Sequence, residues 1–328
     1  MNGSKLLAKV TAVGFMAGAA SALLSPIAYA DVTMLSSLDD PLAGSDTAII
    51  LGGTTEPTPS TAFAQAAENV YLHALGFDDG ATSSTVCDMV GTDPCAAPLQ
   101  VLTTPELIQQ GPSSLTAADD VTLAVENEFQ AEPGAFSAED PLTIFGYSQS
   151  ATAESIAMSR LEADGIPSAD LHFVFIGDPS LADTGVWLNL VPDLDSLLGT
   201  TLTNTVLTDL GFNAVLGDAT PGDIYPTTIY TLAGDGVADF QPDFESGGLL
   251  GTIEGLFLQH VEYLGLTPDE LADAAVTTNG FDLTYVDIPD TINNADAWLS
   301  AVFEHGAAGS GLLESVFQSL ELYLTNIF

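Results

Sequence analysis

A serine lies where an apolar segment of the chain passes directly into a segment with helical character. Residues 142–145 are apolar or β-branched, and the residues that follow read Gly-Tyr-Ser-Gln-Ser. Ser148 therefore stands between Gly146 and Ser150, which is the spacing of a nucleophile elbow. So tight a turn accepts only small flanking residues, and it places the hydroxyl at a helix N-terminus, where negative charge is stabilised. This spacing restricts the chain to folds in which a strand runs straight into a helix.

Further strand and helix patterns alternate along the chain. Continuous apolar and β-branched runs, typical of strands buried on both faces, occupy 47–53, 142–145, 172–176, 227–232 and 281–286. Helical patterns occupy 60–75, 118–129 and 150–163. This alternation predicts an α/β fold with a mostly parallel sheet flanked by helices, and a ligand site at the carboxyl ends of the strands. Gly53, Gly146, Gly177 and Gly234 each stand at such an end.

One segment interrupts this rhythm. Residues 182–223 are rich in Leu, Asp, Gly and Thr with weak periodicity, so we expect an insertion over the active-site face, either a lid or a substrate-shaping subdomain. Residues 310–328 place apolar side chains on one face of a predicted C-terminal helix that packs on the body. We interpret 31–328 as one domain.

The first 30 residues have the pattern of an export signal. Lys5 and Lys9 precede an apolar run at 10–24, and residues 28–30 read Ala-Tyr-Ala, a small-residue cleavage pattern. The alternative is an uncleaved membrane anchor, but the apolar run is short and Pro26 follows it. We therefore expect a secreted or cell-envelope protein.

The charge balance excludes several classes of ligand. The chain carries 45 Asp and Glu residues against 3 Lys and Arg residues, for a net charge of −42, and Arg160 is the only basic residue outside the predicted signal. Such a surface repels nucleic acid and anionic lipid, and it offers almost no cation to bind phosphate. We expect no nucleic-acid partner and no nucleotide cofactor.

The chain contains two cysteines. Cys87 and Cys95 are close in sequence and fit one local disulfide in an oxidising compartment. Neither has a further Cys or a His at the spacing of zinc ligands, so we expect no metal site.

An activated serine requires a carboxylate and a histidine, which follow the serine in that order in chains with this elbow. The acid should follow a strand that ends at the same edge of the sheet. Asp235 follows the strand at 227–232 and is flanked by glycines, so it is the favoured acid. Asp239 and Asp178 remain alternatives, because spacing alone excludes neither.

Four histidines are available as the base. His73 precedes Ser148, and His172 begins a strand at the end of the sheet away from the site. His260 lies about one helix length beyond the acid, whereas His305 stands in a late, Gly-rich context. We therefore favour His260 and keep His305 as the alternative.

The tetrahedral intermediate needs two hydrogen-bond donors. The first is expected to be the backbone N–H of Gln149, directly after the serine. The second is expected from Thr54, at the end of the 47–53 strand, whose hydroxyl is a further candidate donor. Alternatively, residues 52–54 form a simple strand-ending turn.

These motifs together resemble a known family. The elements Gly53-Thr-Thr-Glu56, Gly146-Tyr-Ser-Gln-Ser150, Gly234-Asp-Gly-Val237 and His260-Val-Glu-Tyr263 resemble those of cutinase-like serine esterases. The runs that begin at Phe145, Phe175, Tyr225 and Gly234 are similar to the PE-PPE hydrolase domain of mycobacteria and their relatives. The resemblance implies an α/β-hydrolase fold, a triad of Ser148, Asp235 and His260, and esterase or acyl-transfer activity on lipid esters at the cell envelope.

The sequence thus predicts a secreted serine esterase or lipase-like hydrolase that forms an acyl-enzyme on Ser148 without a cofactor. Its substrate would be a small-molecule or lipid ester, with peripheral association to the envelope and no obligate protein partner. An acyltransferase to sugar-lipid hydroxyls would use the same triad. A non-catalytic lipid-binding protein is a rival of another class, although binding does not require Ser, Asp and His together.

Overall fold

The computed structural model describes residues 33–34, 40–81, 83–279, 282–290 and 295–305. The predicted signal at 1–30 and the predicted helix at 310–328 lie outside the described residues. No helix within the described ranges is both long enough and apolar enough to cross a bilayer.

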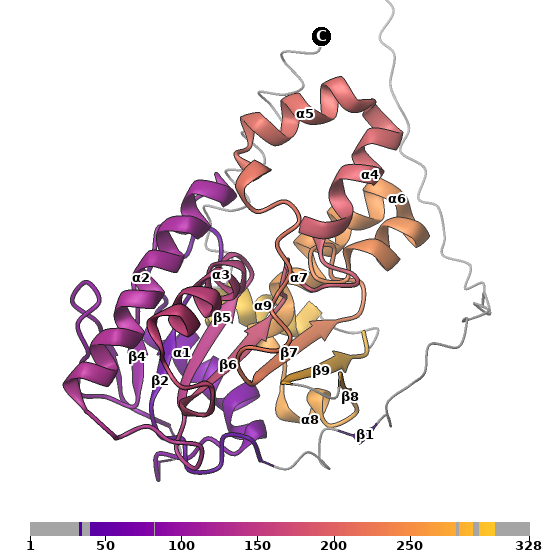
Figure 1. Ribbon diagram of the computed structural model, residues 1–328. Helices are drawn as coiled ribbons and strands as arrows, with labels where there is room; N and C mark the ends of the chain where they lie inside the picture. The colour runs from indigo at the N-terminus through magenta and orange to yellow at the C-terminus, as the bar shows by residue number, and fades with distance from the viewer. Residues whose placement is uncertain (1–32, 35–39, 82, 280–281, 291–294, 306–328) are drawn as a thin grey trace, which may run out of the picture.

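A nine-stranded sheet forms the centre of the described part (Figure 1). In spatial order its strands are β1 (Thr33–Met34), β8 (Ala275–Thr278), β9 (Leu283–Ile288), β7 (Thr227–Leu232), β6 (Leu171–Ile176), β5 (Leu142–Tyr147), β2 (Ala48–Ile50), β4 (Leu99–Val101) and β3 (Val86–Asp88). All neighbours from β9 to β3 pair in parallel, and only β1 with β8 and β8 with β9 pair antiparallel. The predicted mostly parallel α/β fold is confirmed.

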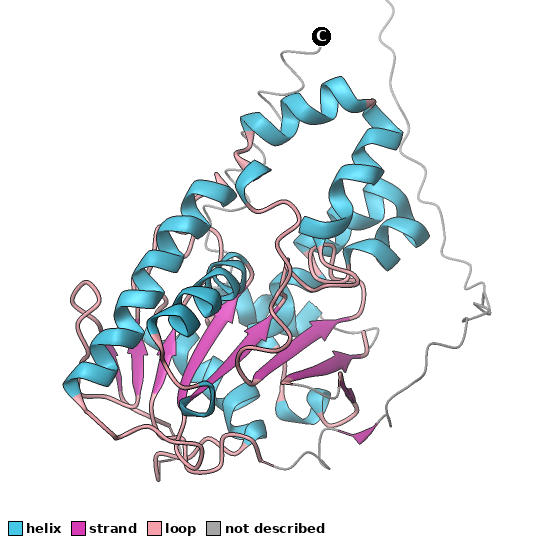
Figure 2. Cartoon of the chain, in the orientation of Figure 1, coloured by secondary structure: helices cyan, strands magenta, loops and turns pink. Residues whose placement is uncertain are grey.

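Helices cover both faces of the sheet (Figure 2). They are α1 (Thr61–Ala67), α2 (Gln110–Ala131), α3 (Gln149–Asp164), α4 (Val186–Leu198), α5 (Thr200–Asp209), α6 (Phe240–Phe257), α7 (Gln259–Glu262), α8 (Pro268–Leu271) and α9 (Ala295–Phe303). Every residue of β5, β6 and β7 is buried, because alternate side chains enter two different cores. Phe145 packs with Phe63 of α1 on one face, and Ile144 packs with Val121 of α2 on the other. This two-sided burial explains the continuous apolar runs in the sequence.

The five predicted strands correspond to β2, β5, β6, β7 and β9. The helix predicted at 60–75 is divided into α1, a π-helical turn at Glu68–Leu72 and a 3₁₀ turn at His73–Leu75. The helix predicted at 118–129 is part of the longer α2. Strands β3, β4 and β8 were not predicted, because none of them lies in a continuous apolar run as the equally short β2 does.

The segment predicted as an insertion is helical. Residues 182–223 contain α4, α5 and a 3₁₀ turn at Phe212–Ala214, and they pack with the start of α6 around a separate small core. Trp187 and Phe240 are buried in that core. In Figure 1 these helices lie beyond the ends of the strands toward which the arrows point. The weak periodicity of the segment reflects helices that bury few residues each.

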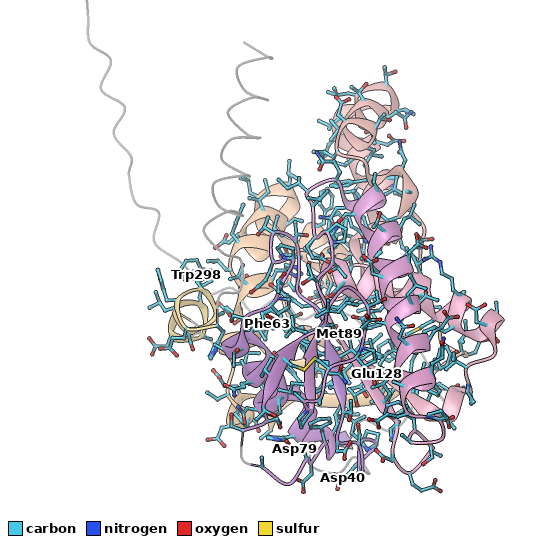
Figure 3. All side chains as sticks on the ribbon, turned by 90° about the vertical axis from the view of Figure 1, so that its left-hand side faces the viewer. Asp40, Phe63, Asp79, Met89, Glu128 and Trp298 are labelled. Atoms are coloured by element: carbon cyan, nitrogen blue, oxygen red, sulfur yellow. A yellow bond between two sulfur atoms is a disulfide. The ribbon has the colours of Figure 1, made fainter. Side chains whose placement is uncertain are left out.

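The predicted disulfide is present. Cys87 of β3 is bonded to Cys95, eight positions later, and closes the loop between β3 and β4 (Figure 3). This bond ties β3, which lies at one edge of the sheet, to the loop that leads to β4.

Candidate active site

Ser148 occupies the turn between β5 and α3, as the elbow pattern requires. Its φ of 58° and ψ of −115° lie in a region that residues other than glycine rarely adopt. Its N–H donates to the carbonyl of Ile176 at 3.0 Å, while the Ser150 hydroxyl accepts the N–H of Tyr147 at 2.8 Å. A Cβ on Gly146 would lie 2.5 Å from a carboxylate oxygen of Glu154. Close packing against Glu154 therefore favours glycine at position 146, and the Ser150 hydroxyl holds the backbone just before the elbow.

The structure brings Ser148, His260 and Asp235 into one row of hydrogen bonds. His260 Nε2 lies 2.8 Å from Ser148 Oγ, and His260 Nδ1 lies 2.9 Å from both carboxylate oxygens of Asp235. All three residues are buried. Because an ionised carboxylate can only accept, Nδ1 carries the proton and Nε2 is left to accept the serine hydroxyl. This is the arrangement that a proton transfer from serine to histidine needs.

Local backbone features determine the positions of Asp235 and His260. Asp235 follows β7 in a turn that begins at Gly234, whose φ is 81°, and the Val237 N–H donates to Asp235 Oδ1 at 2.8 Å. His260 belongs to the short helix α7. At the end of β6, a Cβ on Gly177 would come within 2.9 Å of His260 Cε1. A glycine at that strand end therefore makes room for the imidazole.

The two alternative acids have other partners. Asp239 Oδ2 accepts the Gly234 N–H at 3.0 Å, and Asp178 accepts the Ser180 N–H at 2.8 Å and the Thr220 hydroxyl at 2.5 Å. Burial raises the pKa of both carboxyl groups to about 6. Each of them supports a turn beside the site, and the contact with the imidazole is made by Asp235.

His172 and His305 make contacts away from Ser148. His172 is buried in β6 with Nε2 3.0 Å from the Thr228 hydroxyl, and burial lowers its pKa to about 4. His305 follows α9, where its N–H donates to the carbonyl of Ser300 at 3.1 Å. Of the candidates, His260 is the one placed against Ser148.

The two predicted oxyanion residues meet beside the serine. Gln149 is the first residue of α3, so its N–H has no carbonyl partner within the helix. A Cβ on Gly53 would lie 3.3 Å from Ser148 Cβ, which shows how close the loop that carries Thr54 approaches. The Thr54 hydroxyl donates to Gln149 Oε1 at 3.1 Å and accepts from Gln110 Nε2 at 2.9 Å. Thr54 and Gln149 are thus neighbours, and their role as oxyanion donors stays a prediction.

Sequence reasoning missed three supporting side chains. Gln110, at the start of α2, contacts Thr54 but carries no recognisable motif. Tyr147 donates to the carbonyl of His260 at 2.5 Å, and Tyr263 donates to Asp235 at 2.8 Å. Both tyrosines fall inside motifs that the sequence singled out, yet spacing does not show where their hydroxyls point.

Buried acids lie around the elbow and its neighbouring loop. Burial raises the pKa of Glu106 and of Glu56 to about 8. Burial, followed by the nearby Glu106 and Asp178, raises the pKa of Glu154 well above its usual value. The Arg160 guanidinium lies 2.8 Å from Asp119 and is therefore paired with that carboxylate and not with these buried acids. Burial therefore favours the neutral, protonated form of Glu56, Glu106 and Glu154 in the folded protein.

A mostly parallel sheet with helices on both faces, carrying a serine at a central strand-to-helix turn, is an α/β-hydrolase fold. The chain belongs to the PE-PPE domain family, whose model matches residues 94–290. The resemblance noted from the motifs is therefore confirmed.

Relatives in this family come from Mycobacterium tuberculosis. The chain is 30% identical over 235 residues to the uncharacterized PPE family protein PPE28, covering 70% of this chain and 31% of the relative. It is 29% identical over 259 residues to the esterase PE16, covering 76% of this chain and 43% of that relative. The chain thus spans less than half the length of these relatives. Among solved structures, a cutinase-like protein from Cryptococcus sp. matches at 18% identity and a TM-score of 0.32, over 69% of this chain and 98% of that one.

Proposed function

We propose that the protein is a serine esterase that cleaves carboxylic esters of acyl lipids, with Ser148 as nucleophile, His260 as general base and Asp235 as its partner. The single observation that carries the proposal is the unbroken row from the Asp235 carboxylate through His260 Nε2 to Ser148 Oγ. A serine hydroxyl becomes an effective nucleophile when an oriented imidazole removes its proton.

The reaction proceeds in two halves. Ser148 Oγ attacks the ester carbonyl while His260 Nε2 takes its proton, and the N–H groups of Gln149 and Thr54 stabilise the oxyanion. The intermediate then collapses with cleavage of the bond between the carbonyl carbon and the alkoxide oxygen, and His260 gives its proton to that oxygen. The alcohol departs, and the acyl group remains bonded to Ser148 Oγ as an acyl-enzyme. Water repeats the sequence on the acyl-serine, so that the acid is released and Ser148 is restored.

Two further features support a lipid ester as substrate. The relative PE16 is named an esterase, and the chain shares its domain family. The helices over the site expose leucines, among them Leu198 and Leu250, on a protein that otherwise has a strongly acidic composition. The export pattern at 1–30 is consistent with work at the cell envelope.

The test uses Ser148→Ala with Ser168→Ala as a matched control, since Ser168 is exposed and distant in sequence from the elbow. A fluorophosphonate probe is expected to label the wild type and the control at Ser148, and peptide mapping identifies the site. Turnover of a soluble p-nitrophenyl ester is expected to fall by at least about 10³-fold in Ser148→Ala, with circular dichroism unchanged. Unchanged turnover, or labelling at another residue, would refute the proposal.

A further inference from the structure

The Tyr263 hydroxyl lies in the core, in contact with the carboxylate of Asp235. It accepts the backbone N–H of Leu232, the last residue of β7, at 2.8 Å. It donates to Asp235 Oδ2, also at 2.8 Å. Tyr263 and Asp235 are both fully buried. One hydroxyl therefore links the end of a central strand to the acid of the proposed triad.

The direction of the Tyr263 proton follows from its two partners. The N–H of Leu232 can only donate, so it occupies an acceptor position on the phenolic oxygen. An ionised carboxylate can only accept, so the phenolic proton must point to Asp235 Oδ2. Asp235 Oδ1 accepts the Val237 N–H, and His260 Nδ1 lies between the two carboxylate oxygens. Each oxygen of the carboxylate thus has its own donor besides the imidazole.

The segment that carries both Tyr263 and His260 is itself held by tyrosines. Tyr71 donates to the carbonyl of Tyr263 at 2.6 Å, and Tyr147 donates to the carbonyl of His260 at 2.5 Å. A Cβ on Gly177 would lie 3.1 Å from Tyr263 Cε2 and 2.9 Å from His260 Cε1, so the two rings pack against the same strand end. The imidazole and the phenol therefore reach Asp235 from one rigid segment.

We propose that Tyr263 is a positioning residue of this site, which fixes the rotation of the Asp235 carboxylate and shares its negative charge. The proposal rests on the esterase function proposed above. In a chain with so few basic residues, neutral donors must stabilise a buried carboxylate, and Tyr263 is a side chain that does so beside His260. Without its hydroxyl, Oδ2 would lose a charge-assisted hydrogen bond in a site closed to water.

The test compares Tyr263→Phe with Tyr230→Phe. Tyr230 is equally buried in the same core, its ring centroid lies 4.8 Å from that of Tyr71, and its hydroxyl donates to the carbonyl of Tyr71 at 3.4 Å. The substrate is a soluble p-nitrophenyl ester, and kcat, KM and the pH profile are recorded. For Tyr263→Phe we expect kcat to fall about 10- to 100-fold with KM unchanged. Because the less compensated carboxylate holds the imidazolium more strongly, the acid limb of the profile should move to higher pH. Tyr230→Phe should change kcat by no more than about threefold and should leave the acid limb of the pH profile in place.

If Tyr263→Phe does not fold, a second variant tests the role of the Tyr263 hydroxyl. Replacement of Tyr263 by a ring-fluorinated tyrosine keeps the shape and the hydroxyl but strengthens the donor, so the acid limb should move to lower pH. A wild-type kcat and pH profile in both variants, or an equal loss in Tyr230→Phe, would overturn the role of Tyr263. A wild type that fluorophosphonate does not label would instead refute the esterase function, so the two failures are distinguishable.

Discussion

Two neighbouring regions of the molecule differ in which side chains they bury and which they expose. Around Ser148 the side chains of the proposed triad are buried, and each is hydrogen-bonded to another in the row from Asp235 through His260 to Ser148. The helices α4, α5 and α6 instead leave large apolar side chains in solvent. Leu250, for example, is 80% exposed. We call the first the closed region, because its triad side chains are buried and hydrogen-bonded to one another. We call the second, formed by α4, α5 and α6, the open region, because its leucines are exposed.

This contrast indicates a division of labour within one chain. The helical region has its own small core around Trp187, separate from the two cores of the sheet, so its surface can vary without disturbing the strands. Yet α6 begins five positions after Asp235 and ends three positions before His260. The same segment therefore joins the acid to the base and presents Leu250 to solvent. The sheet positions the side chains of the proposed triad, and we expect the helices to govern which esters approach them.

The largest expected effect comes from the closed region. Asp235→Asn keeps the shape of the side chain, but the amide can donate to His260 Nδ1 and so favours the wrong tautomer of the imidazole. We expect kcat on a soluble p-nitrophenyl ester to fall about 10³- to 10⁴-fold. Steady-state kinetics at pH 8 measures the loss.

The neighbouring acid provides the control for that substitution. Asp239→Asn removes a carboxylate whose Oδ2 accepts the Gly234 N–H, and the amide oxygen can still accept it. Its kcat should remain within about tenfold of the wild type. If Asp239→Asn were the more damaging variant, the assignment of the acid would be wrong.

The buried carboxyl group of Glu106 should give the protein an unusual dependence of stability on pH. Burial raises the pKa of Glu106 from 4.5 to about 8. Between these values the unfolded chain loses this proton while the folded chain keeps it, so the free energy of unfolding falls as pH rises. Glu106→Gln removes the titration and should flatten the slope by up to about 1.4 kcal/mol per pH unit in that window.

Urea unfolding at several values between pH 5 and pH 8 checks this expectation. Glu126→Gln on α2 is a suitable control, because it makes the same Glu-to-Gln change at a position that is partly exposed. A slope that is identical in wild type and Glu106→Gln would show that Glu106 ionises normally in the folded protein.

The closed region was also the part that sequence patterns could predict. A strand buried on both faces must be apolar throughout, so β5, β6 and β7 were visible as continuous runs. The short edge strand β3 bears partly exposed side chains and leaves no such pattern. The helices α4 and α5 each bury only two residues, and thus the segment was predicted as an insertion but not as helices.

Within the site, patterns identified residue types but not directions. Asp178, Asp235 and Asp239 all follow strands that end at one edge of the sheet, and only folding shows which carboxylate faces His260. Gln110 and Tyr263 were missed for the same reason, because a hydrogen bond from a remote helix or a core phenol has no spacing rule. Neighbours in space that are distant in sequence therefore escaped prediction.

The smallest expected effect concerns the open region. Leu198 on α4 and Leu250 on α6 are exposed, and residues 196–208 and 246–253 carry no charged side chain, so these parts of the surface can approach an uncharged lipid without repulsion. Leu198→Gln combined with Leu250→Gln should lower activity on an emulsified long-chain ester about three- to tenfold and leave activity on a soluble short-chain ester unchanged. Leu123→Gln on α2, where the leucine is 48% exposed, is the matched control and should affect neither substrate. An equal loss on both substrates would mean that the helices act through the geometry of the closed region, since α6 joins Asp235 to His260, and the proposed division between the two regions would not hold.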